Sequence, residues 1–197
     1  MIIDTALNDG TPICIRQVKA SDEQRLKDGI ADLSKRSRYL RFFSGMKEAP
    51  QSVIDKLISV DGYNHIAWGA LRTDLDDSPA LGIVHAFRDQ HDAMNAEYSV
   101  AVVDQYHGRG LARLLTAVLL LDCYREGLRE LTVHILAENE AALALTRSLG
   151  GERQGWDGGV TEFDIEIGNA INALRAEHDV PGLADIFERF EERGAGN

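Results

Sequence analysis

Apolar residues alternate with polar or small ones over residues 96–103 and then change to a helical spacing. Tyr98 and Val100 fall on one face of an extended segment and Glu97 on the other, because successive strand side chains point to opposite sides of a sheet. After a short turn, apolar side chains recur at the spacing of one helical face, at Leu111, Leu114, Leu115, Val118 and Leu119. The pattern predicts a strand followed by a long helix, which Gly127 is placed to end.

Comparable patterns predict the remaining elements. The first predicted strand holds Ile13, Ile15 and Val18, and a helix that Ser21 or Asp22 caps follows it to about Leu33. The later predictions are a helical pair over residues 36–43 and beyond Pro50, an antiparallel hairpin of residues 65–71 and 80–87, a strand over 131–136, a helix from Asn139 to the Gly150–Gly151 pair, and a hairpin of residues 152–156 and 160–167.

The last thirty residues have a purely helical pattern. A first helix carries Ile171 and Leu174, and beyond Pro181 an apolar stripe continues through Leu183, Ile186, Phe187 and Phe190. We therefore expect residues 1–167 to form one domain and residues 168–197 to form a helical extension. Apolar stripes usually face a core, which favours docking of this extension onto its own domain. A homodimer interface is the alternative.

Composition and charge limit the class of protein. A chain of 197 residues with 44% hydrophobic and 27% charged residues is ordinary for one globular domain. The formal net charge of -11 argues against a nucleic-acid partner, because phosphate backbones would be repelled. Residues 1–6 do not resemble a leader, and the longest apolar run is too short to span a bilayer, so we expect a cytoplasmic protein with no membrane partner. Cys14 and Cys123 are expected to be core thiols, and the six histidines show no spacing typical of a metal site.

The hexapeptide HGRGLA, residues 107–112, lies between the predicted strand and the long helix. Gly108 and Gly110 carry no Cβ that would block a ligand, and the first amides of a helix lack backbone acceptors. An anion is therefore expected at this turn. The chain has neither GxGxxG nor GxxxxGK[ST], which argues against the common nucleotide loops. The turn predicts a socket for a pyrophosphate.

The order of elements over residues 13–167, together with Glu97, HGRGLA and Asn139, resembles the GNAT superfamily of acyl-CoA-dependent N-acetyltransferases. In the family motif Q/R-x-x-G-x-G/A, Gly110 and Ala112 match, and His107 takes the place of Gln or Arg. The upstream SRYLRFF makes the chain similar to the catalytic domain of Pat-type protein lysine acetyltransferases. The resemblance implies a mixed α/β fold, with a mostly antiparallel sheet that splays at the cofactor site and is flanked by helices.

The resemblance also implies a cofactor site for acetyl-CoA and no metal. The backbone of Val102 would bind the pantetheine arm and Asn139 would touch its thiol end, although Asn139 is equally explained as a helix N-cap. Backbone amides would hold the pyrophosphate, with Arg109 and Arg113 adding charge unless Arg109 is only a solvated loop cation. The predicted pyrophosphate residues are His107, Gly108, Arg109, Gly110, Leu111, Ala112 and Arg113.

By the same resemblance, Glu97 is the expected catalytic base. A protonated amine must lose a proton before it attacks a thioester, whereas charged strand residues are otherwise most often solvent-facing or ion-paired. The expected reaction is direct acetyl transfer to a primary amine acceptor, foremost a protein lysine. Thr146 occupies the position where many relatives have a tyrosine acid, which leaves the general acid open.

Three alternatives remain open at this point. The enzyme could act on a small amine or an aminoglycoside, or the cleft could belong to an acyl-CoA-binding sensor without turnover.

The basic and aromatic stretch at residues 36–43, with Tyr39, Arg41 and Phe42, is expected to form a wall of the acceptor site or to brace the first helices. RNA binding by this stretch is disfavoured by the surrounding acidic charge.

Overall fold

The computed structural model describes residues 1–43 and 49–195. Within those residues a single sheet runs through the molecule in the order β1-β2-β3-β4-β5-β6-β8-β7. Its strands are β1 (Ile2–Ala6), β2 (Pro12–Gln17), β3 (His65–Arg72), β4 (Ala80–Arg88), β5 (Asn95–Val102), β6 (Glu130–Leu136), β7 (Glu152–Asp157) and β8 (Val160–Glu166). Every neighbouring pair is antiparallel except β5 and β6, which are parallel.

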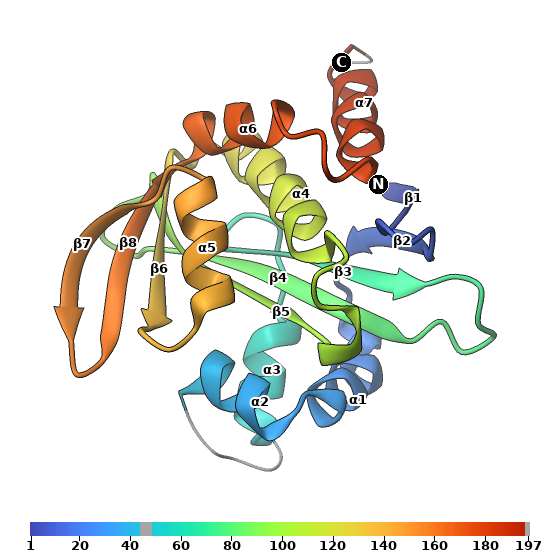
Figure 1. The fold of residues 1–197 in the computed structure, drawn as a ribbon, viewed down its shortest axis with the longest axis horizontal. Coiled ribbons are helices and arrows are strands. Elements are labelled where there is room, and N and C mark those ends of the chain that lie inside the picture. The colour runs from blue at the N-terminus through green and yellow to red at the C-terminus, as the bar shows by residue number, and fades with distance from the viewer. Residues whose placement is uncertain (44–48, 196–197) are drawn as a thin grey trace.

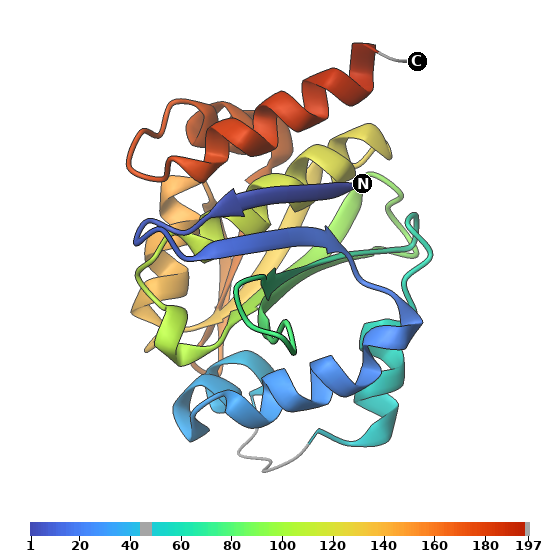
Figure 2. The same ribbon diagram turned by 90° about the vertical axis from the view of Figure 1, so that its right-hand side faces the viewer.

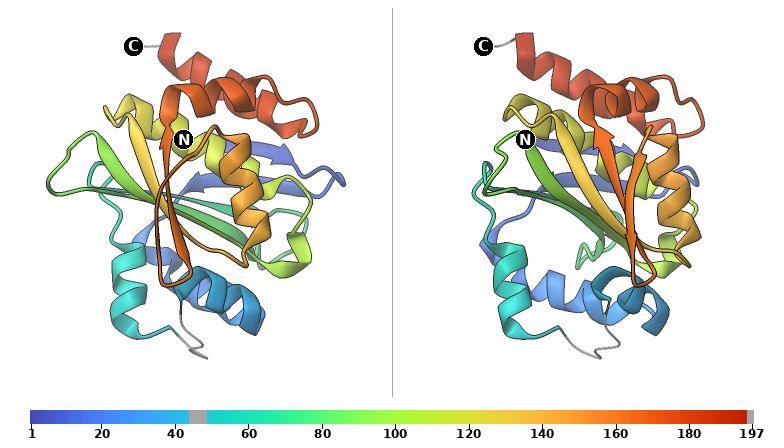
Figure 3. Two further views of the ribbon diagram at one scale, coloured as in Figure 1. Left: turned by 60° about the vertical axis from the view of Figure 1, so that its left-hand side comes forward. Right: turned by 90° about the vertical axis from the view of Figure 1, so that its left-hand side faces the viewer.

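Helices cover both faces of the sheet (Figure 1). They are α1 (Glu23–Asp32), α2 (Lys35–Phe42), α3 (Gln51–Ile58), α4 (Leu111–Arg125), α5 (Glu140–Ser148), α6 (Ile167–Arg175) and α7 (Gly182–Ala195), with 3-10 turns η1 (Ala20–Asp22) and η2 (Asp104–Tyr106). The first three lie on one face, and α4, α6 and α7 lie on the other (Figures 1 and 3). Leu145 and Leu149 place α5 in the same core as α4. None of the helices in the described ranges is long and apolar enough to cross a bilayer.

The main core lies between the sheet and α4. Leu114, Leu115, Val118 and Leu119 are fully buried there, which confirms the helical face predicted from their spacing. Gly127 adopts the left-handed conformation (φ +84°) just beyond the helix, as expected of a helix-ending glycine. A smaller apolar cluster of Leu26, Ile30, Ile54 and Leu57 holds α1 and α3 against the opposite face.

The beginning of the chain differs from the prediction. The sheet starts at β1, not at the strand containing Ile13, and β1 pairs with β2 along the sheet edge. Of its side chains only Ile3 is buried, so the segment shows too little alternation to be recognised from its own residues. Cys14 on β2 is only half-buried, and its prediction as a core thiol was wrong, whereas Cys123 is buried as expected.

The C-terminal helices dock on the same chain. In α7, Leu183 and Ile186 are at most 2% exposed and join the main core with Phe187 and Phe190. The helix lies over β1, as Figure 2 shows, and Thr5 Oγ1 donates a 2.6 Å hydrogen bond to Asp185 Oδ2. The apolar stripe that the sequence displays is therefore covered from within the molecule.

Candidate active site

The central parallel pair of strands opens into a cleft. β5 and β6 pair only over Asn95–Glu97 and Glu130–Thr132, and beyond that point they diverge. The amide of Val103 donates to Leu81 on β4, so by strand alternation the polar groups of Val102 and Val100 point away from β4 and toward the opening. Backbone hydrogen-bonding groups thus line one side of the gap, as the splayed-sheet prediction requires.

A cleft of about 560 Å³ fills this opening and extends to the start of α4. Such a volume is within the usual range for a small-molecule site. Nine of the ten predicted site residues line it, namely Glu97, Val102, His107, Gly108, Gly110, Leu111, Ala112, Arg113 and Asn139. The structure therefore brings together residues that lie more than forty positions apart in the sequence.

The turn before α4 leaves a run of amides without acceptors. Gly108 and Gly110 have φ of +72° and +85°, and Gly110 is the N-cap of α4 with no side-chain cap. Within the described part of the chain, the amides of residues 108–112 donate no hydrogen bond, whereas Arg113 and Leu114 already donate to the Gly110 carbonyl. Unpaired amides at a helix N-terminus favour an anion, both as donors and through the helix dipole.

Two other segments support this turn from outside. A Cβ on Gly110 would lie 2.7 Å from Asn8 Oδ1 and 2.9 Å from Val180 Cγ1. Asn8 accepts nothing from the turn but donates its amide to the Arg109 carbonyl (3.1 Å) and its side-chain nitrogen to the Asp179 carbonyl (3.0 Å). The β1–β2 turn and the segment between α6 and α7 therefore form part of the cleft wall, which the sequence analysis did not foresee.

The two arginines of the turn are engaged with carboxylates. Arg109 Nη1 lies 2.7 Å from Asp9 Oδ2, and its guanidinium stacks on the Tyr106 ring at 5.3 Å from the centroid. Arg109 is the one predicted site residue that does not line the cleft. Arg113 Nε lies 2.8 Å from Glu177 Oε2, although the N–H is not directed at that oxygen. Both guanidinium groups thus already lie beside carboxylates, whereas the amides of residues 108–112 have no acceptor among the described residues.

His107 contacts the strand that the pantetheine arm was expected to use. Its Nε2 lies 2.8 Å from the Val102 carbonyl oxygen, and since a carbonyl only accepts, the imidazole nitrogen donates. The Asp104 carboxylate near this ring accepts from the Ser34 amide and the Ser37 hydroxyl. Burial acts to raise the pKa of Asp104, but the hydrogen bonds from Ser34 and Ser37 outweigh it and lower the pKa overall. The contact ties the turn to β5.

Glu97 lies at the other end of the cleft, on the face covered by α2. It is exposed, and it shares its register position with Phe87 on β4 and Thr132 on β6. Tyr98 points to the opposite face, where its hydroxyl meets Thr116 Oγ1 at 2.8 Å. Burial raises the pKa of Tyr98 to about 12, so this phenol stays neutral and serves as packing, as predicted.

The helix after β6 completes the wall. Asn139 caps α5 by accepting the Ala142 amide at 3.2 Å, and it also lines the cleft, so the cap and the wall are compatible uses of one side chain. Thr146 lines the cleft from the same helix and is 2% exposed. No group of three or more potential metal ligands occurs among the residues that the structure describes.

A mostly antiparallel sheet that parts beside the N-terminus of a buried helix is the architecture of the GNAT class of N-acetyltransferases. Comparison with known proteins agrees. The family model described as "Acetyltransferase (GNAT) family" matches residues 38–150, more than half of the chain. The chain therefore belongs to this family.

Individual relatives and solved structures give the same assignment. The chain is 25% identical over 165 residues to Acetyltransferase Pat of Mycolicibacterium smegmatis, covering 84% of this chain and 49% of that protein. It thus spans about half the length of that relative. Acetyltransferase PA5475 of Pseudomonas aeruginosa is 29% identical over 145 residues, covering 74% and 77%. The GNAT domain of S. lividans PAT has the same fold, with a TM-score of 0.76 at 20% identity over 84% of this chain and 96% of that one.

A further solved structure was determined with a cofactor. The acetyltransferase yncA from Salmonella typhimurium, described as a structure with its cofactor acetyl-CoA, superposes with a TM-score of 0.62 at 15% identity, covering 79% of this chain and 94% of that chain. The fold is thus one that binds acetyl-CoA in at least one solved example.

Proposed function

We propose that the chain transfers the acetyl group of acetyl-CoA to a primary amine, with a protein lysine as the leading acceptor and Glu97 as the proton acceptor. The observation that carries the proposal is the run of amides at residues 108–112 without acceptors, at the mouth of a cleft between diverging strands. This is the donor set that a diphosphate requires. Residues 1–167 would form the catalytic domain and residues 168–197 the extension that closes its wall.

Each part of the cofactor has a counterpart in the cleft. The amides of residues 108–112 would hold the diphosphate, whereas the Arg113 amide, which was also predicted to do so, already donates to the Gly110 carbonyl. The backbone of Val102, facing the gap, would pair with the amides of the pantetheine arm. Because His107 donates to the Val102 carbonyl, binding would exchange that bond for one to the cofactor. Asn139 and Thr146 would lie along the arm beyond it. The acetyl thioester supplied by the cofactor would then approach the end of the cleft that holds Glu97.

The transfer itself is proposed as direct attack. The amine nitrogen bonds to the acetyl carbon while the carbon–sulfur bond breaks, the amine proton passes to Glu97, and the electron pair leaves on the thiolate. Because a thiol has a pKa of about 8.5, its thiolate can depart without an acid, which suits a cleft in which Thr146 stands in place of tyrosine. The Val102 amide would donate to the oxygen on which charge develops.

The decisive comparison is Glu97→Gln with Glu162→Gln as the matched control. Glu162 is a carboxylate on the same sheet face, paired with His134 at 3.1 Å. Thiol release from acetyl-CoA would be measured with lysine peptides, polyamines and aminoglycosides. We expect Glu97→Gln to lower kcat by about 10²- to 10⁴-fold, with the Kd for CoA unchanged within about twofold because uncharged Gln keeps the shape of the cleft.

The outcomes separate the alternatives. Activity retained by Glu97→Gln would contradict the base role. Activity confined to polyamines or aminoglycosides would replace lysine by a small amine as acceptor. Tight CoA binding without turnover on any amine would favour the sensor. Mass measurement in solution decides whether the chain forms a homodimer.

A further inference from the structure

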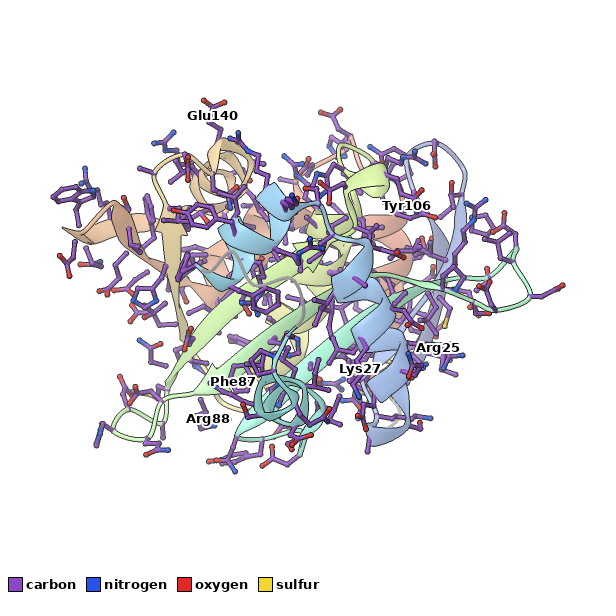
Figure 4. All side chains as sticks on the ribbon, turned by 90° about the horizontal axis from the view of Figure 1, so that it is seen from below. Arg25, Lys27, Phe87, Arg88, Tyr106 and Glu140 are labelled. Atoms are coloured by element: carbon purple, nitrogen blue, oxygen red, sulfur yellow. The ribbon has the colours of Figure 1, made fainter. Side chains whose placement is uncertain are left out.

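A second cavity lies next to the active-site cleft, between α1 and the sheet. It has a volume of about 70 Å³. α1 lies over β4 on this side of the molecule, and Figure 4, which is seen from that side, shows Arg25 and Lys27 on the helix. The walls consist mainly of apolar or small residues, among them Leu26, Gly29, Ile30, Leu57, Ala80 and Ile83. The cavity is therefore an apolar space beneath the first helix.

The polar side chains around the cavity offer little to a polar occupant. Arg16 donates to both carboxylate oxygens of Asp22, at 2.7 and 2.6 Å. Arg25 Nε and His85 Nε2 have no partner among the described residues, but both atoms are covered and present no surface to the cavity. A buried water molecule needs two to four polar partners. The space thus suits an apolar group better than water.

Three residues line both the cavity and the cleft, namely Leu33, Arg41 and Ala101. Arg41 belongs to the basic and aromatic stretch of residues 36–43, and its Nη2 donates a 2.7 Å hydrogen bond to Ser99 Oγ on β5. Ala101 contributes only a methyl group to the shared wall. The two spaces therefore adjoin, and a thin wall of three residues separates them.

The shared wall lies at the end of the cleft proposed for the thioester. Ala101 directly precedes Val102, whose amide is proposed to hold the thioester oxygen, and it pairs with Ile83 of β4, which lines the cavity. Glu97 lies five residues before Val102 on the same strand. The cavity is thus closer to the acyl side of the proposed reaction centre than to the carboxylate that would receive the amine proton.

Gly29 of α1 keeps part of the cavity open. A Cβ at this position would lie 3.8 Å from Ala80 Cβ, which is an ordinary contact, so the packing of α1 on the sheet leaves room for alanine. Glycine weakens a helix relative to alanine, yet α1 has glycine where it lines the cavity. A larger side chain at position 29 would occupy cavity volume, which makes this residue a direct probe of what the cavity holds.

We propose that this cavity is an acyl pocket, and that the chain transfers short, uncharged acyl groups longer than acetyl. The inference rests on the proposed function, because it concerns the same thioester site. One water molecule needs about 10 to 15 Å³ of such volume, so the cavity admits roughly two to four carbon atoms beyond the acetyl group. The amine nitrogen bonds to the acyl carbon while the carbon–sulfur bond breaks, the proton passes to Glu97, and the electron pair leaves on the thiolate.

Binding of acyl-CoA thioesters in the absence of an amine tests the pocket. Calorimetry would give the Kd of acetyl-, propionyl-, butyryl-, hexanoyl- and octanoyl-CoA. A buried methylene group contributes up to about fourfold in affinity, so we expect the Kd to fall about two- to fourfold per methylene from acetyl to butyryl. The gain should end by octanoyl, whose chain is longer than the cavity. A butyryl-CoA Kd equal to that of acetyl-CoA would overturn the inference.

Cavity-filling variants connect the chain-length effect to this space. In Gly29→Leu the ratio of the acetyl-CoA Kd to the butyryl-CoA Kd should fall close to one. Ala31→Leu adds a similar side chain at an exposed position of the same helix and should keep the ratio of the unmodified protein. Should Gly29→Leu fail to fold, Gly29→Ala takes its place, with a smaller fall in the ratio expected. An unchanged ratio in the folded Gly29 variant would place the acyl chain elsewhere and refute the pocket.

Failure of the proposed function has a different result. If neither acetyl-CoA nor any longer thioester binds, the coenzyme A site itself is refuted. If acetyl-CoA binds and is turned over while affinity does not depend on chain length, only the acyl pocket is wrong. If Gly29→Leu raises the KM of the amine and leaves the Kd ratio unchanged, the cavity belongs to the acceptor, and the inference is equally wrong.

Discussion

Gly110 connects the backbone of the cleft to two distant parts of the chain. Its φ of +85° is a left-handed conformation, and the space for a Cβ is filled by Asn8 and Val180. Gly108 has a similar φ of +72°, but a Cβ there would meet nothing within 4 Å. The two glycines of one hexapeptide are therefore required for different reasons, one for conformation alone and the other for conformation and close contact.

Substitution of each glycine by alanine separates these two reasons. Gly108→Ala should lower the free energy of unfolding by about 1 to 2 kcal/mol, the usual cost of a left-handed alanine. Gly110→Ala should cost at least about twice as much, because Asn8 and Val180 must also move. Urea denaturation of both variants measures the difference. Equal losses would show that the supporting segments give way freely.

The residues of the cleft were predictable to the extent that they lie in one local pattern. HGRGLA identified the helix entrance, and strand alternation put Glu97 and Tyr98 on opposite faces. The contacts that require tertiary structure were not predictable. No residue near Arg41 in the sequence indicates that its side chain bonds Ser99, which lies 58 positions away. The residues around His85 are apolar and give no sign of its hydrogen bond to His65.

The C-terminal helix and the first strand form a structural unit. α7 packs on β1 and α4, and the loop that precedes it supplies Asp179 and Val180 to the cleft wall. The buried side chains of α7 recur at helical spacing and form one face of the helix, and the exposed side chains form the other. The apolar face of α7 is therefore packed against the rest of the same chain. The extension is thus part of the fold that positions the site.

Removal of one α7 side chain should destabilise the whole molecule. Ile186 is 0% exposed, and Ile186→Ala should lower the free energy of unfolding by about 2 to 5 kcal/mol through lost burial and a cavity. Glu188→Ala on the exposed side of the same helix should change it by less than about 0.5 kcal/mol. Denaturant midpoints of the two variants give the comparison. A silent Ile186→Ala would indicate that α7 is not docked in solution.

Most elements followed from their own residues, and β1 shows why one did not. Helix spacing, glycine stops and turn residues are local, and they predicted α4, α5 and both hairpins. β1 contributes one buried side chain, and its stability comes from pairing with β2 and from Thr5 bonding Asp185, 180 positions away. Such an edge strand exists only once the rest of the fold is present.

Acidic groups dominate the charge of the molecule as a whole, but two basic side chains, both histidines, are buried inside it. The net charge is -11, and near the turn Asp9 and Glu177 engage the two nearby arginines. Beneath α3, His65 and His85 are at most 5% exposed. Desolvation lowers the pKa of both, so the unfolded chain binds protons that the folded chain excludes.

Stability should therefore fall as the solution is acidified below the ordinary histidine pKa. The contribution is fully present above about pH 6.5 and is lost as the pH falls, at about 1.4 kcal/mol per unit for one group. Between pH 6.5 and 5 we expect the free energy of unfolding to fall, with the larger part of the loss coming from His85. In His85→Gln this loss should be at least halved, whereas His178→Gln, at an exposed position, should retain it. Urea denaturation midpoints across this pH range measure the loss. If the free energy of unfolding of His85→Gln depended on pH as steeply as that of the unmodified protein, His85 would not be its source.

The central claim is that backbone amides at the entrance of α4 hold the diphosphate of coenzyme A. Amide-resolved ¹⁵N NMR titration of the full chain with CoA tests it most directly, with pantetheine, which lacks the diphosphate, as the comparison ligand. We predict that CoA shifts the amides of residues 108–112 and Val102 most strongly, and that pantetheine shifts Val102 but leaves the turn unperturbed. Saturating CoA that leaves the amides of residues 108–112 unchanged would contradict the account.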